Sequence, residues 1–140
     1  IKEAFKFLGI KPEKRLNSEW ADIFLSMERL DEKWTELLLK MKNAPELTDA
    51  LTFENEFEAA FEQLLWYFIY RQFSLAAEDG RMKERLTFAL ESCLFIRRIC
   101  ALHEKSCGSL SLEDIVEYSR MYSSEMEYSE ENVENYLNLC

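Results

Sequence analysis

Three of the four cysteines of this chain and its one histidine lie in a single stretch, CLFIRRICALHEKSC, residues 93–107. Thiolates and imidazoles are the side chains that hold zinc, and they also carry redox and nucleophilic chemistry. Cys93, Cys100 and Cys107 recur every seven residues, so on a helix successive Cα atoms lie about 10 Å apart at a rise of about 1.5 Å per residue. A shared zinc needs sulfur atoms about 2.3 Å from the metal, and a disulfide needs Cα atoms within about 7 Å. The spacing therefore predicts thiols packed along a helix, with no cluster.

A tighter subset consists of Cys100, His103 and Cys107, in which the histidine stands three and four residues from the two thiols. His103 could join either cysteine in holding a metal if further ligands came from elsewhere in the fold. The CxxC pairs that mark zinc sites are missing. We predict no metal site, with this subset as the alternative. The cysteines are then expected to be small core residues, and the histidine is favoured near a helix end by the helix dipole.

A second group with chemical potential lies in WYFIYRQF, residues 66–73, and FIRR, residues 95–98. If two long helices pack antiparallel, these segments face each other, and a buried arginine there needs a partner such as Glu62 or Glu91. The alternative is that the arginines extend to the surface at helix ends. No GxGxxG, P-loop or GxSxG motif is present, so no catalytic residue is assigned. The candidate polar pocket consists of Tyr67, Tyr70, Arg71 and Arg97.

The elements that position these residues are predicted to be helices. With 3 Gly and 2 Pro in 140 residues, 48% of them hydrophobic, few breaks interrupt the apolar periodicity. After an irregular start, the spacing predicts helices over about 20–41, as one kinked helix or two, and over 52–78, 82–105, 112–124 and 130–140. Residues 64–70 are all apolar or aromatic, which is typical of a central, buried helix. Caps are predicted at Asn17 or Ser18, Asp31, Ser111 with Asp114, and Ser129, and stops at Gly80 and Gly108.

These patterns predict an all-α fold, a single domain over residues 1–140 with about five to six helices and two long central antiparallel ones. The formal net charge of -10 argues against nucleic acid, which needs clustered Lys and Arg. The longest apolar run, residues 64–70, is far shorter than the roughly 20 residues that a bilayer span requires. With no signal peptide visible and no disulfide framework, we expect a cytoplasmic protein without a membrane partner.

Three stretches resemble a known family: MERLDEKWTELL at 27–38, LLWYFIYRQF at 64–73, and SLEDIVEYSRMYSSEMEYSEENVENYL at 111–137. Their order and spacing are similar to the C-terminal helical part of the bacterial flagellin lysine-N-methylases. The resemblance implies a parent enzyme that transfers a methyl group from S-adenosylmethionine to lysines of flagellin. It also implies an iron-sulfur cluster in a cysteine-rich N-terminal part that has no counterpart here, so no cofactor is expected in this chain.

The chain begins with Ile1, and we expect it to be the C-terminal part of a longer protein, inactive alone. Lysine methylation needs an oriented, unprotonated amine, for which the candidates are Tyr67, Tyr70, Tyr118 and Tyr122. A homodimer is possible. The alternative function is a non-enzymatic helical ligand-binding or dimerisation domain, such as the effector domain of a transcription regulator, which is an analogy of architecture.

Overall fold

The computed structural model describes residues 2–10, 15–46 and 53–140, which form helices and no strand. The helices are α1 (Lys2–Leu8), α2 (Asn17–Leu25), α3 (Glu32–Asn43), α4 (Asn55–Asp79), α5 (Met82–Cys107), α6 (Leu112–Tyr122), a π-helical turn η1 (Ser123–Glu127) and α7 (Glu130–Leu137). The all-α prediction is confirmed. The described α-helices exceed the expected number because α1 lies in the start that was predicted irregular, and because α2 and α3 are separate. None of these helices combines the length and apolar character needed to cross a membrane.

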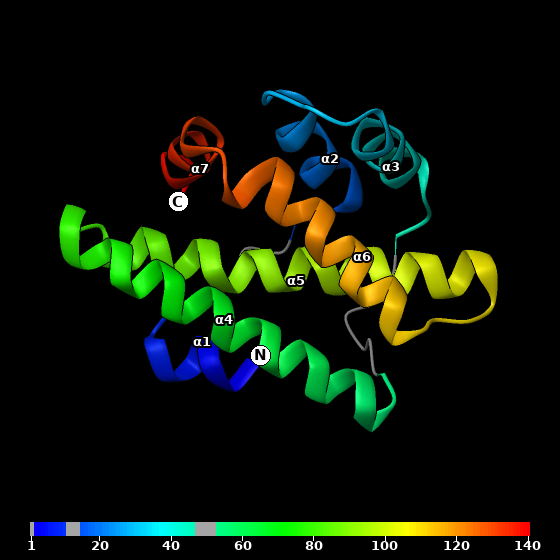
Figure 1. The fold of residues 1–140 in the computed structure, drawn as a ribbon, viewed down its shortest axis with the longest axis horizontal. Coiled ribbons are helices and arrows are strands. Elements are labelled where there is room, and N and C mark those ends of the chain that lie inside the picture. The colour runs from blue at the N-terminus through cyan, green and yellow to red at the C-terminus, as the bar shows by residue number, and fades with distance from the viewer. Residues whose placement is uncertain (1, 11–14, 47–52) are drawn as a thin grey trace.

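The two longest helices, α4 and α5, form the predicted antiparallel hairpin (Figure 1). The chain reverses at Gly80, which has a left-handed φ of 73° and whose N–H donates to the Ala76 carbonyl at 2.8 Å. Gly108 ends α5 in the same way, with a φ of 82°. Residues with a side chain pay a steric cost at such φ values, so glycine is the natural stop at both positions.

The central helix is α5. Figure 1 shows α1 beside α4, α2, α3 and α7 on the other side of α5, and α6 crossing α5. From Phe88 to Ile96, all α5 residues except Leu94 are buried. The prediction that residues 64–70 are fully buried is wrong, since Trp66 is 63% and Tyr70 is 78% exposed. The 7-residue α1 is too short to cover the outer face of the 25-residue α4.

An aromatic cluster joins the helices above α5. The Phe95 ring lies 4.6 Å from the ring of Phe24, and 5.6 to 5.8 Å from those of Trp20, Trp34 and Tyr122. These rings come from α2, α3, α5 and α6, and most meet edge to face. Such pairs contribute about 0.5–1.5 kcal/mol each beyond the burial of apolar area. The cluster therefore holds three helices, α2, α3 and α6, to one ring of α5.

Three of the predicted helix caps are confirmed. Asp31, Ser111 and Ser129 accept backbone N–H groups of the first turns of α3, α6 and α7 at 2.9, 3.2 and 3.2 Å. Each bond pairs a donor that a helix start otherwise leaves without a partner. The signals for these three helix starts are therefore local to the sequence.

Asn17 is not the cap of α2. It is the first residue of the helix and is fully buried, and Glu19 accepts the N–H of the cap residue Leu16 at 3.0 Å instead. The Asn17 side chain accepts from Arg98 of α5 at 2.8 Å and donates to the Pro45 carbonyl at 3.2 Å. A capping residue type is thus used here to tie α2 to two distant segments.

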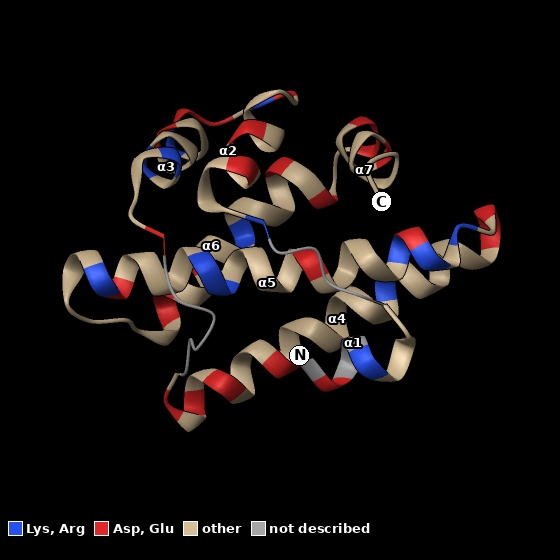
Figure 2. Ribbon diagram, turned by 180° about the vertical axis from the view of Figure 1, so that it is seen from behind, with Lys and Arg blue, Asp and Glu red and all other residues tan. Residues whose placement is uncertain are grey.

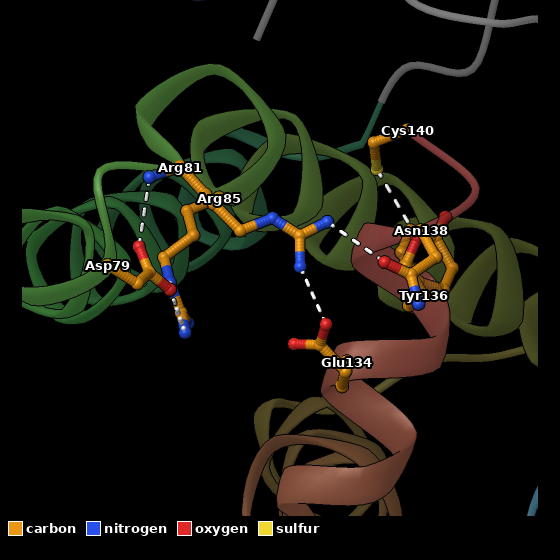
Figure 3. Close-up of polar contacts among 7 residues, drawn as sticks. All are labelled: Asp79, Arg81, Arg85, Glu134, Tyr136, Asn138 and Cys140. Atoms are coloured by element: carbon orange, nitrogen blue, oxygen red, sulfur yellow. Dashed lines mark hydrogen bonds and ion pairs between the residues drawn. The ribbon is translucent and has the colours of Figure 1, made fainter.

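The α4–α5 turn is also tied to the C-terminal helix. Arg81 donates to Glu134 at 2.8 Å and to Asn138 at 3.1 Å (Figure 3). Asp79 accepts from the Arg81 N–H at 2.9 Å and from the Arg85 guanidinium at 2.7 Å. Led by the Arg81 N–H bond, these contacts lower the pKa of Asp79. They set the orientation of α7 against the hairpin end, although exposed ion pairs contribute little stability.

The loop between α2 and α3 is held by a buried carboxylate. Glu125 of η1 accepts the backbone N–H of Leu30 at 2.8 Å and of Asp31 at 2.7 Å, across 95 and 94 residues of sequence. The amide of Asn132 donates to the carbonyls of Glu28 and Glu125, both at 2.9 Å. Bonds from N–H groups to an ionised carboxylate are stronger than neutral ones. This loop therefore depends on the C-terminal segment for its shape.

We predict that Glu125→Ala lowers the free energy of unfolding by about 2–4 kcal/mol. Two charge-assisted hydrogen bonds are lost, and the backbone N–H groups of Leu30 and Asp31 are left without their acceptor. Urea denaturation followed by helical circular dichroism measures the effect. The control is Glu117→Ala on the exposed face of α6, expected to change stability by less than about 0.5 kcal/mol. Equal stability of the two variants would refute the role of Glu125.

Candidate functional site

The structure brings together three of the four residues of the predicted polar pocket. Tyr67, Tyr70 and Arg71 line one shallow hollow of about 630 Å³ on the outer face of α4. Arg97 lies elsewhere, opposite Glu58. Glu58 precedes Tyr67 by nine residues, roughly 13 Å along the helix at a rise of about 1.5 Å per residue. The predicted pocket is therefore incomplete, because the register of the hairpin places FIRR against an earlier part of α4.

The polar groups of this hollow are tied to a buried acid. Arg71 Nε lies 2.7 Å from Glu127, and the Tyr67 hydroxyl donates to the same carboxylate at 2.7 Å. Ser123 donates to its second oxygen at 2.8 Å. Burial, and then the bond to Glu127, raise the pKa of Tyr67. The expected partners Glu62 and Glu91 are wrong for Arg71, and the network serves to satisfy a buried charge.

Arg97 makes a two-pronged ion pair with Glu58. Its two terminal nitrogens lie 2.7 and 3.1 Å from the two carboxylate oxygens, and its guanidinium lies 5.0 Å from the ring centres of Phe53 and Phe61. Burial acts to raise the pKa of Glu58, but the bond and charge of Arg97 outweigh it, so the net shift is downward. Arg97 is therefore a partly buried residue at the edge of a second hollow.

The second hollow lies between α1 and α4, has a volume of about 650 Å³, and is acidic and aromatic. Its acids are Glu3, Glu58 and Glu62, and Trp66 forms part of its wall. No ion pair is formed by Glu3 or Glu62 with any residue that the structure describes. Carboxylates beside an exposed indole are suited to bind an organic cation. We call this the α1–α4 hollow.

The alternative metal set is not assembled. Cys100 is fully buried and Cys107 is exposed at the end of α5, so the expectation that all three heptad thiols are core residues is wrong for Cys107. The His103 ring nitrogens lie 2.7 Å from the Tyr118 hydroxyl and 3.3 Å from Asp114. Among the described residues, no three His, Cys, Asp or Glu side chains are arranged to hold a metal ion.

A third hollow, of about 550 Å³, lies beside His103 where α3, α5 and α6 meet. We call it the α3–α5–α6 hollow. Its apolar lining residues are Leu37, Met41, Ala44, Pro45, Ile99, Leu102 and Met121. Its polar lining residues are Lys33, Glu36, Lys40, His103, Lys105, Ser106, Cys107 and Tyr118. Sequence reasoning missed this hollow, because its lysines come from two helices that are far apart in the chain.

The candidate tyrosines differ in access. Tyr122 is fully buried, and its hydroxyl lies 2.6 Å from that of Ser92, so it is not accessible to orient a substrate amine. Tyr118 lies in the α3–α5–α6 hollow, where burial, followed by nearby acidic groups, raises its pKa to about 12. Tyr67 is engaged by Glu127. Tyr70 is the most exposed of the four.

The described cysteines do not fit an iron-sulfur cluster, which needs several thiolates around one point. Cys93 and Cys100 are buried in α5, and burial raises the pKa of each to about 12, which favours the neutral thiol. Cys107 and Cys140 are exposed, at the end of α5 and after α7. The α3–α5–α6 hollow does not suit S-adenosylmethionine either, because its lysines repel a sulfonium cation.

Fold and hollows together define an all-helical domain with a central α5 and with concave surfaces of opposite charge. Over residues 1–140 the chain matches the model of the FliB lysine N-methylase C-terminal domain, and it belongs to that family. No curated protein and no solved structure matches it. The family match confirms the resemblance, while the possible homodimer and the regulator-type alternative stay predictions.

We predict that Cys93→Ser lowers the free energy of unfolding by about 1–3 kcal/mol, because the hydroxyl is buried without a well-placed partner. Cys93 is fully buried and its sulfur lies 3.5 Å from the Phe61 carbonyl, too far for a serine hydroxyl bond without movement. Thermal unfolding measures the change. Cys140→Ser, at an exposed thiol, is the matched control, and an unchanged melting temperature for Cys93→Ser would contradict its core role.

Proposed function

We propose that this chain is the C-terminal domain of a cytoplasmic enzyme that transfers methyl groups from S-adenosylmethionine to lysine side chains of flagellin. The family match supports a methylase parent. The resemblance adds the iron-sulfur cluster, which would be bound by another part of the parent since the cysteines here do not fit it. We assign the methyl-transfer chemistry to that other part as well, because the lysines of the α3–α5–α6 hollow repel a sulfonium donor.

Within that enzyme, we assign the domain the role of docking the lysine-bearing substrate. The observation that supports this is the α1–α4 hollow, where Glu3, Glu62 and the 63% exposed Trp66 lie on one surface. The net charge of -10 attracts a cationic partner over a distance of about 10 Å. Figure 2 shows acidic residues along the N-terminal half of α4, and two of the acids there, Glu58 and Glu62, line this hollow. A lysine ammonium would pair with the acids and rest on the indole.

The hollow lined by Tyr67, Tyr70 and Arg71 is less suited to this role. Arg71 brings a positive charge into it, and the nearby carboxylate of Glu127 is fully buried and shared by Arg71, Tyr67 and Ser123. A substrate lysine in this hollow would therefore meet the cation of Arg71, and none of the described residues that line the hollow is an acid. The α1–α4 hollow differs because its one arginine, Arg97, is already paired with Glu58.

We predict that Glu62→Gln combined with Trp66→Ala raises the KM of the full-length methylase for flagellin about fivefold and leaves kcat unchanged, since exposed ion pairs and cation–π contacts contribute up to about 1 kcal/mol each. Methylated lysines are counted by mass spectrometry over a series of flagellin concentrations. An unchanged KM for flagellin opposes the docking role.

The matched control is Glu56→Gln with Phe73→Ala, an acid and an aromatic on exposed positions of the same helix outside the hollow. This control is expected to keep the wild-type KM. A fall in kcat at constant KM in the hollow variant would place the hollow in methyl transfer and contradict docking. Absence of any lysine methylation by the wild-type enzyme would refute the methylase assignment itself.

A further inference from the structure

The α3–α5–α6 hollow has the two features of a site for small amphiphiles. Its volume of about 550 Å³ falls in the range of roughly 300–1,000 Å³ that is usual for ligand pockets. Its apolar part is formed by five large aliphatic side chains, of which Met41 and Ile99 are buried. Such a surface favours the apolar body of a ligand by removing it from water.

The charge of this hollow is opposite to that of the chain. Lys33 and Lys40 of α3 and Lys105 of α5 line it, against one glutamate, Glu36, while the chain carries a net charge of -10. None of the three lysines forms an ion pair with a residue in the described ranges. His103 is already engaged by Asp114 and Tyr118. The lysines are therefore available to a ligand.

We propose that the α3–α5–α6 hollow binds a small amphiphile with an anionic head group and an apolar tail. The tail lies against the aliphatic side chains and the head group pairs with the lysines at the rim, with the Ser106 hydroxyl as a further donor. Two helices distant in sequence supply the cations, so the site exists only in the folded chain. The site is independent of the docking role of the α1–α4 hollow.

Cys107 provides a reporter for this site. It is exposed and lines the hollow, with its sulfur 4.0 Å from His103 Nδ1. Cys140 is also exposed but lies after α7, outside the hollow, and the other two thiols are buried. A ligand in the hollow shields Cys107 from iodoacetamide and leaves Cys140 reactive. The alkylation rate of Cys140 is therefore an internal control in the same protein sample.

The test compares decanoate, decanol and decyltrimethylammonium, below their micelle-forming concentrations, by calorimetric titration and by the rate of Cys107 alkylation. Decanoate is expected to bind most tightly and to slow alkylation of Cys107 alone. Lys33→Met with Lys40→Met and Lys105→Met is expected to weaken decanoate about tenfold, since three individually weak exposed ion pairs are lost together, and to leave decanol binding within about twofold.

The control is Lys6→Met with Lys42→Met and Lys83→Met, which removes the same charge at positions outside the hollow and should keep decanoate affinity near wild type. Methionine keeps the length of the lysine stem, and helical circular dichroism verifies that both triple variants fold. The proposal is overturned if Cys107 is not protected, if decanol or the cation protects it as well as decanoate, or if both triple variants lose decanoate affinity equally.

Discussion

The structure depends on the packing of aromatic rings around one position of α5. Phe95 contacts rings from α2, α3 and α6, and Phe24 extends the cluster to Tyr136 of α7, with ring centres 5.9 Å apart. α2, α3 and α7 are only 8 to 12 residues long, and isolated helices of that size are marginal in water. Their stability must come from this shared core, so the short helices and α5 form one cooperative unit.

Buried carboxylates fix how the helices are oriented around that core. Glu125 pairs with the loop before α3, Glu127 with α4, and Glu91 of α5 accepts the Tyr136 hydroxyl at 2.5 Å. Apolar packing alone allows helices to slide or rotate, whereas a buried charge requires particular donors. These acids therefore specify how the C-terminal segment lies on the rest.

The charge that remains exposed is distributed over two hollows of opposite sign. The α1–α4 hollow carries Glu3 and Glu62 beside Trp66, two acids without an ion pair to any described residue, and the α3–α5–α6 hollow carries three lysines over an aliphatic floor. The first suits a lysine-bearing protein and the second an anionic amphiphile.

Local signals in the sequence determined the fold class and many helix boundaries. The scarcity of Gly and Pro, the apolar periodicity, the caps Asp31, Ser111 and Ser129, and the stops at Gly80 and Gly108 act within a few residues, so they can be read without a structure. The family resemblance was also visible in the order of three helical segments.

Tertiary structure alone decided which helix is central, which polar residues meet, and where the hollows lie. Residues 64–70 are apolar enough to be buried on every side, yet Trp66 and Tyr70 are exposed because α1 is too short to cover the outer face of α4. Arg97 meets Glu58 because of the hairpin register, and the lysines of α3 and α5 converge through packing. Each of these outcomes depends on contacts between distant segments, for which periodicity and local propensity carry no information.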